Sequence, residues 1–368
     1  MPTLSRRKTL ALIGGGTILA ATASAGTFLT TRTPHAALAP WEAAGGYDDP
    51  RLDALSYALL APNPHNRQPW EAELVGDDGI MLWRDKTRDL PVTDPFGRQL
   101  TIGMGCFLEL CRMAAAERGF AMETVLFPDG EDGPVARLTL VDGGEPDPLF
   151  AHVMARRSHK DAFEGRAVGA EAAALAEHAT SYLEGPDRDA LRDHALDAWL
   201  AEAATPEAWQ ESVDLLRIGK AEIEAQPDGI DLGGPMMESL ALAGIFTREA
   251  AADPDNPGTR DAIESTAFAI AHAPAITLTI TPGNTRPDQI EAGRRWLRLN
   301  LAATGAGLAL RPVSQALQEY EAVLPIREAV HARFAPDGGT VQMLGLLGYG
   351  ERTPRTPRWP LETRLRHA

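Results

Sequence analysis

The chain has 368 residues, a hydrophobic fraction of 44% and a net charge of −16, which would become −19 without the basic residues 1–25. This length fits two domains or one large two-lobed domain, and the hydrophobic fraction is ample for a core. The acidic balance disfavours nucleic acid and anionic membranes as partners, so a phosphate-bearing ligand would need a local basic pocket.

The amino-terminus has the pattern of an export signal. Residues 5–8 (SRRK) precede 23 uncharged residues, Thr9 to Thr31, and residues 23–25 (ASA) match a small-x-small cleavage site. We interpret residues 1–25 as a twin-arginine signal that sends the chain to the periplasm. The uncharged run is long enough to span a bilayer, so an uncleaved anchor is the alternative and the one expected membrane contact. A disordered basic tail would explain the arginines but not the apolar run.

A linker rich in Ala, Pro and Gly is expected over residues 26–49, before a first helix from Pro50 to Leu60. Beyond it, short alternating runs predict strands, and longer runs with helical spacing predict helices. The predicted strands are Glu71–Leu74, Met81–Arg84, Thr124–Phe127, Val135–Leu140, Ala275–Ile280 and Val341–Leu347, and the two long helices are Gly103–Gly119 and Asp288–Leu308. Residues 168–272 are rich in Ala and Glu, which indicates a mostly helical insertion or lid.

The cysteines and the short motifs exclude several classes of site. Cys106 and Cys111 are five residues apart, which places them on different sides of a helix, so we expect small core residues and no disulfide between them. The chain has no CxxC or HExxH motif and no close pair of histidines, so no metal site is predicted. It also lacks the nucleophile elbow of serine hydrolases and the glycine-rich loop of P-loop enzymes.

A weak internal repeat links the two long helices. A shift of 188 residues places Gly105, Ala114, Ala115 and Gly119 over Gly293, Ala302, Ala303 and Gly307. Small residues at matching depths allow two helices, or a helix and a flat ligand, to approach closely. Gly119 and Gly307 are also placed as carboxy-terminal caps.

The most informative segment is the loop over residues 61–70 (APNPHNRQPW). Its prolines hold the backbone extended, and its amide side chains present donors and acceptors at fixed angles. Such a loop suits recognition of the edge of a heteroaromatic ring. An ordinary capped turn that leads into a strand is the alternative.

Two motifs together resemble the flavin-dependent nitroreductase family. The loop is similar to the family's SxxNxQPW segment, and residues 156–163 (RRSHKDAF) are similar to its RRSxR motif. Their reversed order, with residues 94–100 (DPFGRQL) and 356–361 (TPRWPL), resembles the Acg-like branch, in which two nitroreductase-like halves are fused in one chain. The resemblance implies an α+β fold with two lobes of mostly antiparallel sheet flanked by helices, over residues 50–150 and 151–368, so that one chain mimics a dimer.

The resemblance also implies one FMN per chain and the residues that hold it. Guanidinium groups suit phosphate, and the expected phosphate ligands are Arg156, Arg157, Ser158, Lys160 and Arg358. The ring would contact Pro62, Asn63, Asn66 and Gln68 of the loop, and Ser314 would lie near the flavin N5. Two plainer explanations stay open: Arg156 and Arg157 could simply end a helix, and Ser314 could cap the helix through Tyr320.

The implied function is an FMN-dependent oxidoreductase of the nitroreductase type. It would pass electrons through flavin N5 from a small-molecule donor to a nitroaromatic, a quinone or a similar acceptor. The alternative is a protein that sequesters FMN under a cover and turns over slowly or not at all. The flavin carries the chemistry, so no side chain is assigned a catalytic role, and His65 and His159 are read as loop or capping histidines.

Overall fold

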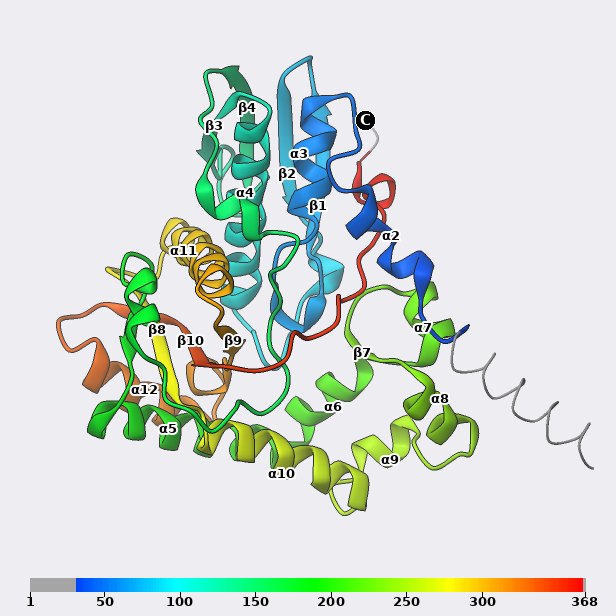
Figure 1. The fold of residues 1–368 in the computed structure, drawn as a ribbon, viewed down its shortest axis with the longest axis vertical. Coiled ribbons are helices and arrows are strands. Elements are labelled where there is room, and N and C mark those ends of the chain that lie inside the picture. Colours follow the sequence, from blue (N-terminus) through cyan, green and yellow to red (C-terminus); the bar gives the residue numbers. More distant parts are fainter. Residues whose placement is uncertain (1–30, 367–368) are drawn as a thin grey trace, which may run out of the picture.

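The computed structural model describes residues 31–366 and contains two four-stranded sheets, in which every pair of neighbouring strands is antiparallel. The first sheet has the order β1 (Trp70–Val75), β2 (Gly79–Arg84), β4 (Ala136–Asp142), β3 (Phe120–Leu126). The second has the order β5 (Thr180–Tyr182), β8 (Ala275–Thr281), β10 (Thr340–Gly348), β9 (Ala309–Pro312). Helices flank both sheets (Figure 1), and the expected α+β class is therefore confirmed.

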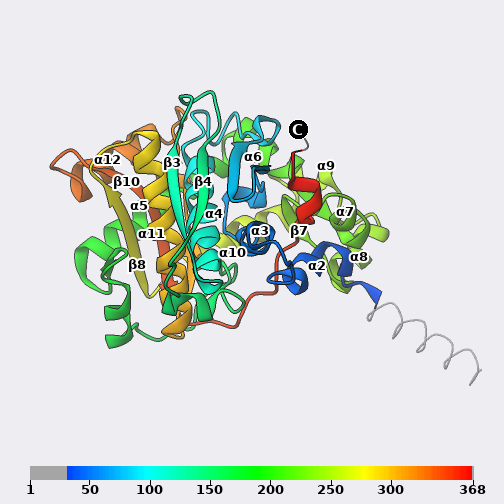
Figure 2. The same ribbon diagram turned by 90° about the horizontal axis from the view of Figure 1, so that it is seen from above.

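Two 20-residue helices, α4 (Arg98–Glu117) and α11 (Arg286–Gly305), pack against each other at the centre of the molecule (Figure 2). Helix α4 is buried on nearly all sides, and its buried side chains include the polar Arg98, Gln99 and Glu109. Helix α11 begins at a capping box formed by Thr285 and Asp288. Both helices start a few residues before the predicted positions.

The predicted repeat corresponds to the contact between these helices. A Cβ atom at Gly105 would lie 2.1 Å from the Ile290 carbonyl oxygen, and one at Gly293 would lie 2.0 Å from the Ile102 carbonyl oxygen. Gly105 and Gly293 are 188 residues apart, and so are Ile102 and Ile290. The contact is thus reciprocal, and only glycine permits this approach of the two backbones.

The two sheets also share one topology. In each, two strands precede the long helix and two follow it, and the strands are ordered first, second, fourth, third. The second sheet carries in addition α12 (Leu324–Phe334), between β9 and β10, which the sequence analysis did not predict. The predicted helix through Tyr320 is instead a short 3-10 turn, η5 (Gln315–Leu317).

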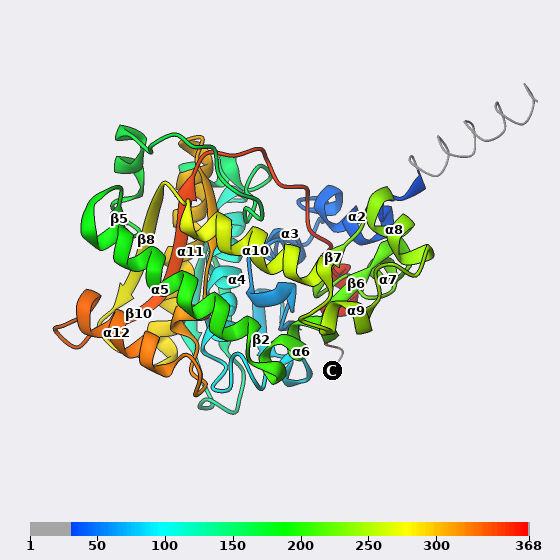
Figure 3. The same ribbon diagram turned by 90° about the horizontal axis from the view of Figure 1, so that it is seen from below.

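The region over residues 168–272 is mostly helical, as expected. It contains α5 (Gly185–Ala203), α6 (Pro206–Asp214), α7 (Gly219–Ala225), α8 (Pro235–Leu242), α9 (Arg248–Ala252) and α10 (Pro257–Ala271), with a short parallel pair, β6 (Leu216–Ile218) and β7 (Ile230–Leu232). Helix α5 runs along the second sheet and α10 packs beside α5, whereas α6 to α9 extend away from the sheet (Figure 3).

The segment expected to be a linker is partly helical. Helix α2 (His35–Ala43) precedes α3 (Pro50–Ala58), and its Trp41 is 1% exposed. The indole Nε1 of Trp41 donates to the carbonyl of Thr356 at 2.8 Å, which ties α2 to the carboxy-terminal segment. The remaining 3-10 turns are η1 (Pro64–Asn66), η2 (Lys86–Arg88), η3 (Pro148–His152), η4 (Ala170–Leu175) and η6 (Leu361–Arg364).

Residues 1–25, interpreted as the export signal, lie outside the described residues. Within residues 31–366, no helix combines the length and the apolar character that a membrane crossing requires. Cys106 and Cys111 are both buried free thiols on α4, so they are core residues as predicted.

Candidate flavin site

The loop over residues 61–70 is rigid and locally strained. His65, Asn66 and Gln68 have φ values of +46°, +50° and +49°, which are uncommon for residues other than glycine. The backbone N–H of Gln68 donates to Asn63 Oδ1 at 2.7 Å, and this bond helps to hold the turn. Residues kept in sparsely populated conformations cluster at functional sites, and these three account for most of the non-glycine positive φ values in residues 31–366.

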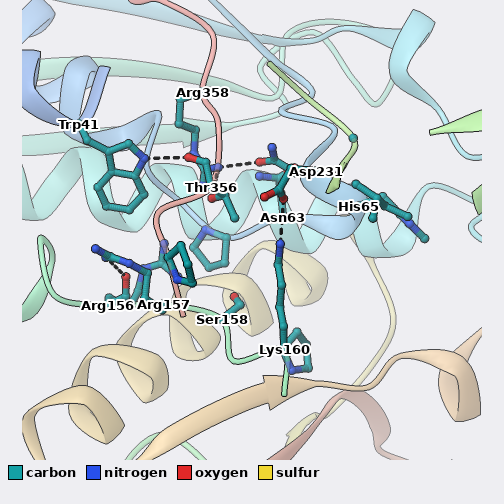
Figure 4. A pocket seen from close by; sticks show the side chains of 16 residues that line it. Trp41, Asn63, His65, Arg156, Arg157, Ser158, Lys160, Asp231, Thr356 and Arg358 are labelled. Atoms are coloured by element: carbon teal, nitrogen blue, oxygen red, sulfur yellow. Dashed lines mark hydrogen bonds and ion pairs between the residues drawn. The ribbon is translucent and has the colours of Figure 1, made fainter. Parts of the chain in front are cut away.

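A first cavity, which we call the cationic cavity, has a volume of ≈180 Å³ and lies where this loop meets several segments distant in the sequence. Four basic side chains line it, namely Arg156, Arg157, Lys160 and Arg358, and Figure 4 shows them around one space. The other lining residues are Trp41, Pro62, Asn63, His65, Asn66, Ser158, Gly229, Ile230, Asp231, Pro312, Pro354 and Thr356. The structure therefore brings the RRS segment and the carboxy-terminal arginine together, as the resemblance implied.

The guanidinium groups of this cavity are held in an unfavourable environment for their charge. Burial, followed by repulsion from Arg156, lowers the pKa of Arg358 to about 9. Burial lowers the pKa of Arg156 to about 10, and burial followed by repulsion from Arg355 and Arg352 lowers that of Arg157 to about 10. Within residues 31–366, none of the three forms an ion pair with a carboxylate. A bound anion would relieve both effects.

Arg358 organises the polar groups around the cationic cavity. Its Nη1 donates to Asn66 Oδ1 and to Thr356 Oγ1, each at 2.6 Å, and its Nη2 donates to the carbonyls of Leu60 and Ala61. Arg156 also donates to the Leu60 carbonyl, at 2.7 Å. Both arginines thus fix the start of the loop as well as the charge of the cavity.

Lys160 differs from the arginines because it has a carboxylate partner. Its Nζ lies 2.8 Å from Asp231 Oδ1, and Asp231 lies on β7 of the helical insertion. The insertion thus supplies the one carboxylate that lines the cationic cavity.

A second cavity, which we call the amide cavity, has a volume of ≈210 Å³ and a different chemistry. Its walls are mostly apolar and carry amide and hydroxyl groups, and burial lowers the pKa of its one histidine, His65, which favours the neutral imidazole. The lining residues are Pro62, Asn63, Pro64, His65, Gln99, Ile102, Gly103, Cys106, Trp296, Pro312, Ser314, Gln315 and Met343. Such walls suit a planar, uncharged ring with polar edges.

The two cavities are neighbours and share Pro62, Asn63, His65 and Pro312. Each alone is smaller than the roughly 300 to 1,000 Å³ typical of small-molecule sites. Together they offer cations at one end and an apolar, amide-edged slot at the other. This arrangement fits FMN, whose phosphate is a dianion and whose ring is flat.

Most of the predicted site residues line one of these cavities, but two need correction. Gln68 is 0% exposed and lines neither cavity, because its Nε2 donates to the Pro227 carbonyl and its Oε1 accepts from the Trp359 N–H. Asn66 lines the cationic cavity and not the amide cavity, because its side chain bonds Arg358 and the Pro357 carbonyl. Of the predicted ring contacts in the loop, Pro62 and Asn63 line both cavities.

The remaining predicted residues are placed as follows. Ser314 lines the amide cavity and precedes η5, where its side chain makes no capping hydrogen bond. Arg157 and Ser158 line the cationic cavity, and Arg157 Nη1 donates to the carbonyls of Met154 and Arg156. His65 lines both cavities, whereas His159 lies outside them and packs against Phe163.

The sequence analysis missed Trp41, Asp231 and the α4 side chains that face the amide cavity. For Trp41, the one available indication was a large aromatic side chain in a segment expected to be a linker. For Asp231 the sequence offered no indication, because its position beside Lys160 depends on how the insertion folds back. Within the described part of the chain, no group of three or more His, Cys, Asp or Glu side chains is placed to hold a metal ion.

No family model matches the sequence, but individual proteins do. The chain is 26% identical over 332 residues to the Mycobacterium tuberculosis (strain ATCC 25618 / H37Rv) protein named "Putative NAD(P)H nitroreductase Rv3131", a match that covers 84% of this chain and 91% of that protein. It is 37% identical over 79 residues to "Putative NAD(P)H nitroreductase acg" of the same strain, or 22% of this chain and 24% of that protein. The expected resemblance to nitroreductases is therefore confirmed.

A solved structure with a related description is the FMN-dependent nitroreductase NfnB from Mycobacterium smegmatis in complex with NADPH. It is 18% identical, with a TM-score of 0.35, and the match covers 60% of this chain and 98% of that chain.

Proposed function

We propose that the chain binds one FMN and acts as an oxidoreductase of the nitroreductase type. The observation that carries the proposal is the pairing of the two cavities. The cationic cavity would hold the phosphate through Arg156, Arg157, Lys160 and Arg358. The amide cavity would hold the ring against Trp296 and Met343, with Asn63 and Ser314 at its edges.

When bound, FMN would supply the capacity to accept a hydride and to pass electrons to a second small molecule. The residues of this chain would bind the flavin, orient it and limit the access of water. No side chain of the amide cavity is required as an acid or base. The donor would be a small molecule such as a nicotinamide nucleotide, and the acceptor a nitroaromatic, a quinone or a similar compound.

A second candidate function is the sequestration of FMN with little or no turnover. It is favoured by the segment 227–231 of the insertion, which we call the docking segment. The docking segment contributes Gly229, Ile230 and Asp231 to the wall of the cationic cavity, and its Pro227 carbonyl accepts from Gln68 Nε2 at 2.6 Å. A cofactor covered in this way would dissociate slowly, and electron donors and acceptors would reach it slowly.

Anaerobic mixing of the purified protein with NADH or NADPH separates the two candidates. An oxidoreductase should show rapid bleaching of the flavin, followed by reoxidation when a quinone or nitroaromatic is added. A flavin that stays oxidised with both nucleotides, but is reduced by dithionite, would contradict the oxidoreductase and favour sequestration.

We also propose that residues 1–25 direct twin-arginine export and that the chain functions in the periplasm, anchored if the signal stays uncut. Fractionation of cells that express the full chain, with mass measurement of the product, tests this. The expected product is periplasmic and begins near Gly26. An uncut chain that remains in the cytoplasm would contradict it.

The shared topology of the two sheets and the reciprocal glycine contact support a further proposal, that one chain mimics a nitroreductase dimer. In that arrangement the first half lends the loop at residues 61–70, and the second half supplies the RRS segment. The cationic cavity between the loop and the RRS segment would then correspond to one flavin per chain.

A further inference from the structure

Trp41 lies where several positive charges meet. It lines the cationic cavity, and its ring centroid is 4.8 Å from the guanidinium carbon of Arg157, 5.4 Å from that of Arg355 and 5.7 Å from that of Arg358. Figure 4 shows the indole beside the cavity, with Arg358 and Arg157 at different sides of it. Helix α2 thus brings an aromatic face to a cluster of guanidinium groups.

These guanidinium groups repel one another, and few acids compensate them. Arg355 pairs with Glu42, which also lies on α2. Arg157 and Arg358 have no carboxylate ion-pair partner in residues 31–366, and burial lowers the pKa of both. The hydrogen bonds of both side chains go to uncharged oxygen atoms, so a contact that carries partial negative charge would stabilise both guanidinium groups further.

The indole ring provides such a contact, because the face of an aromatic ring carries partial negative charge and attracts cations. It does so without introducing a carboxylate, which would compete with a phosphate for the same arginines. Two hydrogen bonds to the carboxy-terminal segment fix the position of the ring, one from the ring itself and one to its helix. Its Nε1 donates to the Thr356 carbonyl at 2.8 Å, and the Arg358 N–H donates to the Ala37 carbonyl of the same helix at 2.8 Å.

We infer that Trp41 is a positioning residue for phosphate binding and acts through Arg157 and Arg358. This inference rests on the proposed FMN site. It assigns a role in the site to α2, the helix that follows the export segment. Loss of the indole should therefore weaken the binding of flavins that carry a phosphate and leave the binding of a flavin without a phosphate nearly unchanged.

The test is a titration of the full-length protein with FMN and, separately, with riboflavin, which has the same ring and no phosphate. In Trp41→Leu, the Kd for FMN should rise about tenfold, as expected when cation–π contacts to two desolvated guanidinium groups are lost. The Kd for riboflavin should change less than twofold. Trp41→Phe keeps an aromatic face and should raise the Kd for FMN by less than Trp41→Leu does.

The matched control is Trp209→Leu. Trp209 is partly buried and, like Trp41, donates through Nε1 to a backbone carbonyl, that of Ala251, but it lines neither cavity. Its replacement should leave both dissociation constants within twofold of the wild type. Equal losses for FMN and riboflavin in Trp41→Leu, or no loss for either, would overturn the inference.

If Trp41→Leu does not fold, the comparison of Trp41→Phe with Arg157→Gln and with the double variant decides. Coupled residues should give a combined loss smaller than the product of the separate losses, whereas independent losses would overturn the inference. If the wild type binds FMN and the variants keep the wild-type ratio of the Kd for FMN to the Kd for riboflavin, only the role of Trp41 is contradicted. A wild-type protein that binds neither flavin overturns the proposed function and this inference together.

Discussion

Arg358 and Asn66 show how a single contact changes the expected role of a residue. The sequence suggested that Asn66 would face the ring and Arg358 the phosphate. In the structure Arg358 Nη1 donates to Asn66 Oδ1 at 2.6 Å, and both line the cationic cavity. The two residues therefore lie at the same end of the candidate site.

Arg358→Ala should weaken FMN retention by about 1.5 to 3 kcal/mol, because it removes a charge-assisted contact to the phosphate. Asn66→Ala should also weaken retention, by a smaller amount, because it releases one end of the Arg358 side chain. Equilibrium dialysis of FMN measures both. If Asn66→Ala instead retains FMN fully and changes the flavin spectrum, Asn66 contacts the ring and not the phosphate end of the site.

His331 gives a residue-level prediction for pH. Its Nε2 accepts from the Val341 N–H at 3.1 Å, while Nδ1 lies 2.8 Å from the Arg327 carbonyl, so the neutral imidazole satisfies both partners. Burial lowers its pKa in the folded state. Below the unfolded pKa of about 6.5, the unfolded chain gains a proton that the folded chain resists, so stability falls as the pH falls.

The free energy of unfolding in urea should therefore drop more between pH 7.5 and 5.5 in the wild type than in His331→Gln. Carboxylates titrate in both proteins, so their contribution cancels when the pH dependence of the free energy of unfolding is compared between them. Equal slopes, or a steeper slope in His331→Gln, would contradict the assignment.

At the level of elements, the sequence predicted what depends on local pattern. Strands β1, β2, β3, β4, β8 and β10 and helices α3, α4 and α11 were expected near their observed positions, because each has a clear period. Helix α2 was missed because its stability comes from a partner 315 residues away, through the Trp41 to Thr356 hydrogen bond. The role of Gln68 was missed for the same reason, since Pro227 belongs to the insertion.

The docking segment is held mainly by one carboxylate. Asp228 is 6% exposed and accepts from Arg88 Nη1 at 2.5 Å and from Arg217 Nη2 at 2.7 Å, with Arg67 Nη1 at 3.8 Å. Arg67 belongs to the loop and Arg88 to η2, whereas Asp228 and Arg217 belong to the insertion. This cluster therefore joins the insertion to the candidate site.

Asp228→Asn should release the docking segment, because loss of one partner leaves buried arginines uncompensated, at a cost of about 3 to 5 kcal/mol. Hydrogen exchange of residues 216–232 should accelerate, and bound FMN should dissociate faster. Asp187→Asn, which removes an exposed pair with Arg333, should cost no more than about 1 kcal/mol and change neither. Unchanged exchange in Asp228→Asn would mean that other contacts hold the segment.

At the level of the whole molecule, the long helices that accompany the two sheets meet where α4 crosses α11. A side chain at Gly105 or Gly293 would collide with the facing backbone, and the helices carry Gln99, Gly103 and Trp296 of the amide cavity. The sequence revealed the repeat through small residues at matching depths. It could not reveal that the matched glycines touch each other, because that requires the relative placement of the halves.

Gly293→Ala should lower the free energy of unfolding by about 1 to 3 kcal/mol, because the helices must separate to admit the methyl group. It should also weaken ligand binding in the amide cavity. Gly165→Ala is the control, since a Cβ there meets nothing within 4 Å. Urea unfolding of both variants measures the difference, and an unchanged stability in Gly293→Ala would contradict the close crossing.

The central claim is that the two cavities form one FMN site in each chain. The visible absorption spectrum of the purified full-length protein, with the flavin released and quantified, tests it most directly. The account predicts the bands of an oxidised flavin and close to one FMN per chain, either as purified or after incubation with FMN. A colourless protein that takes up no FMN would contradict it.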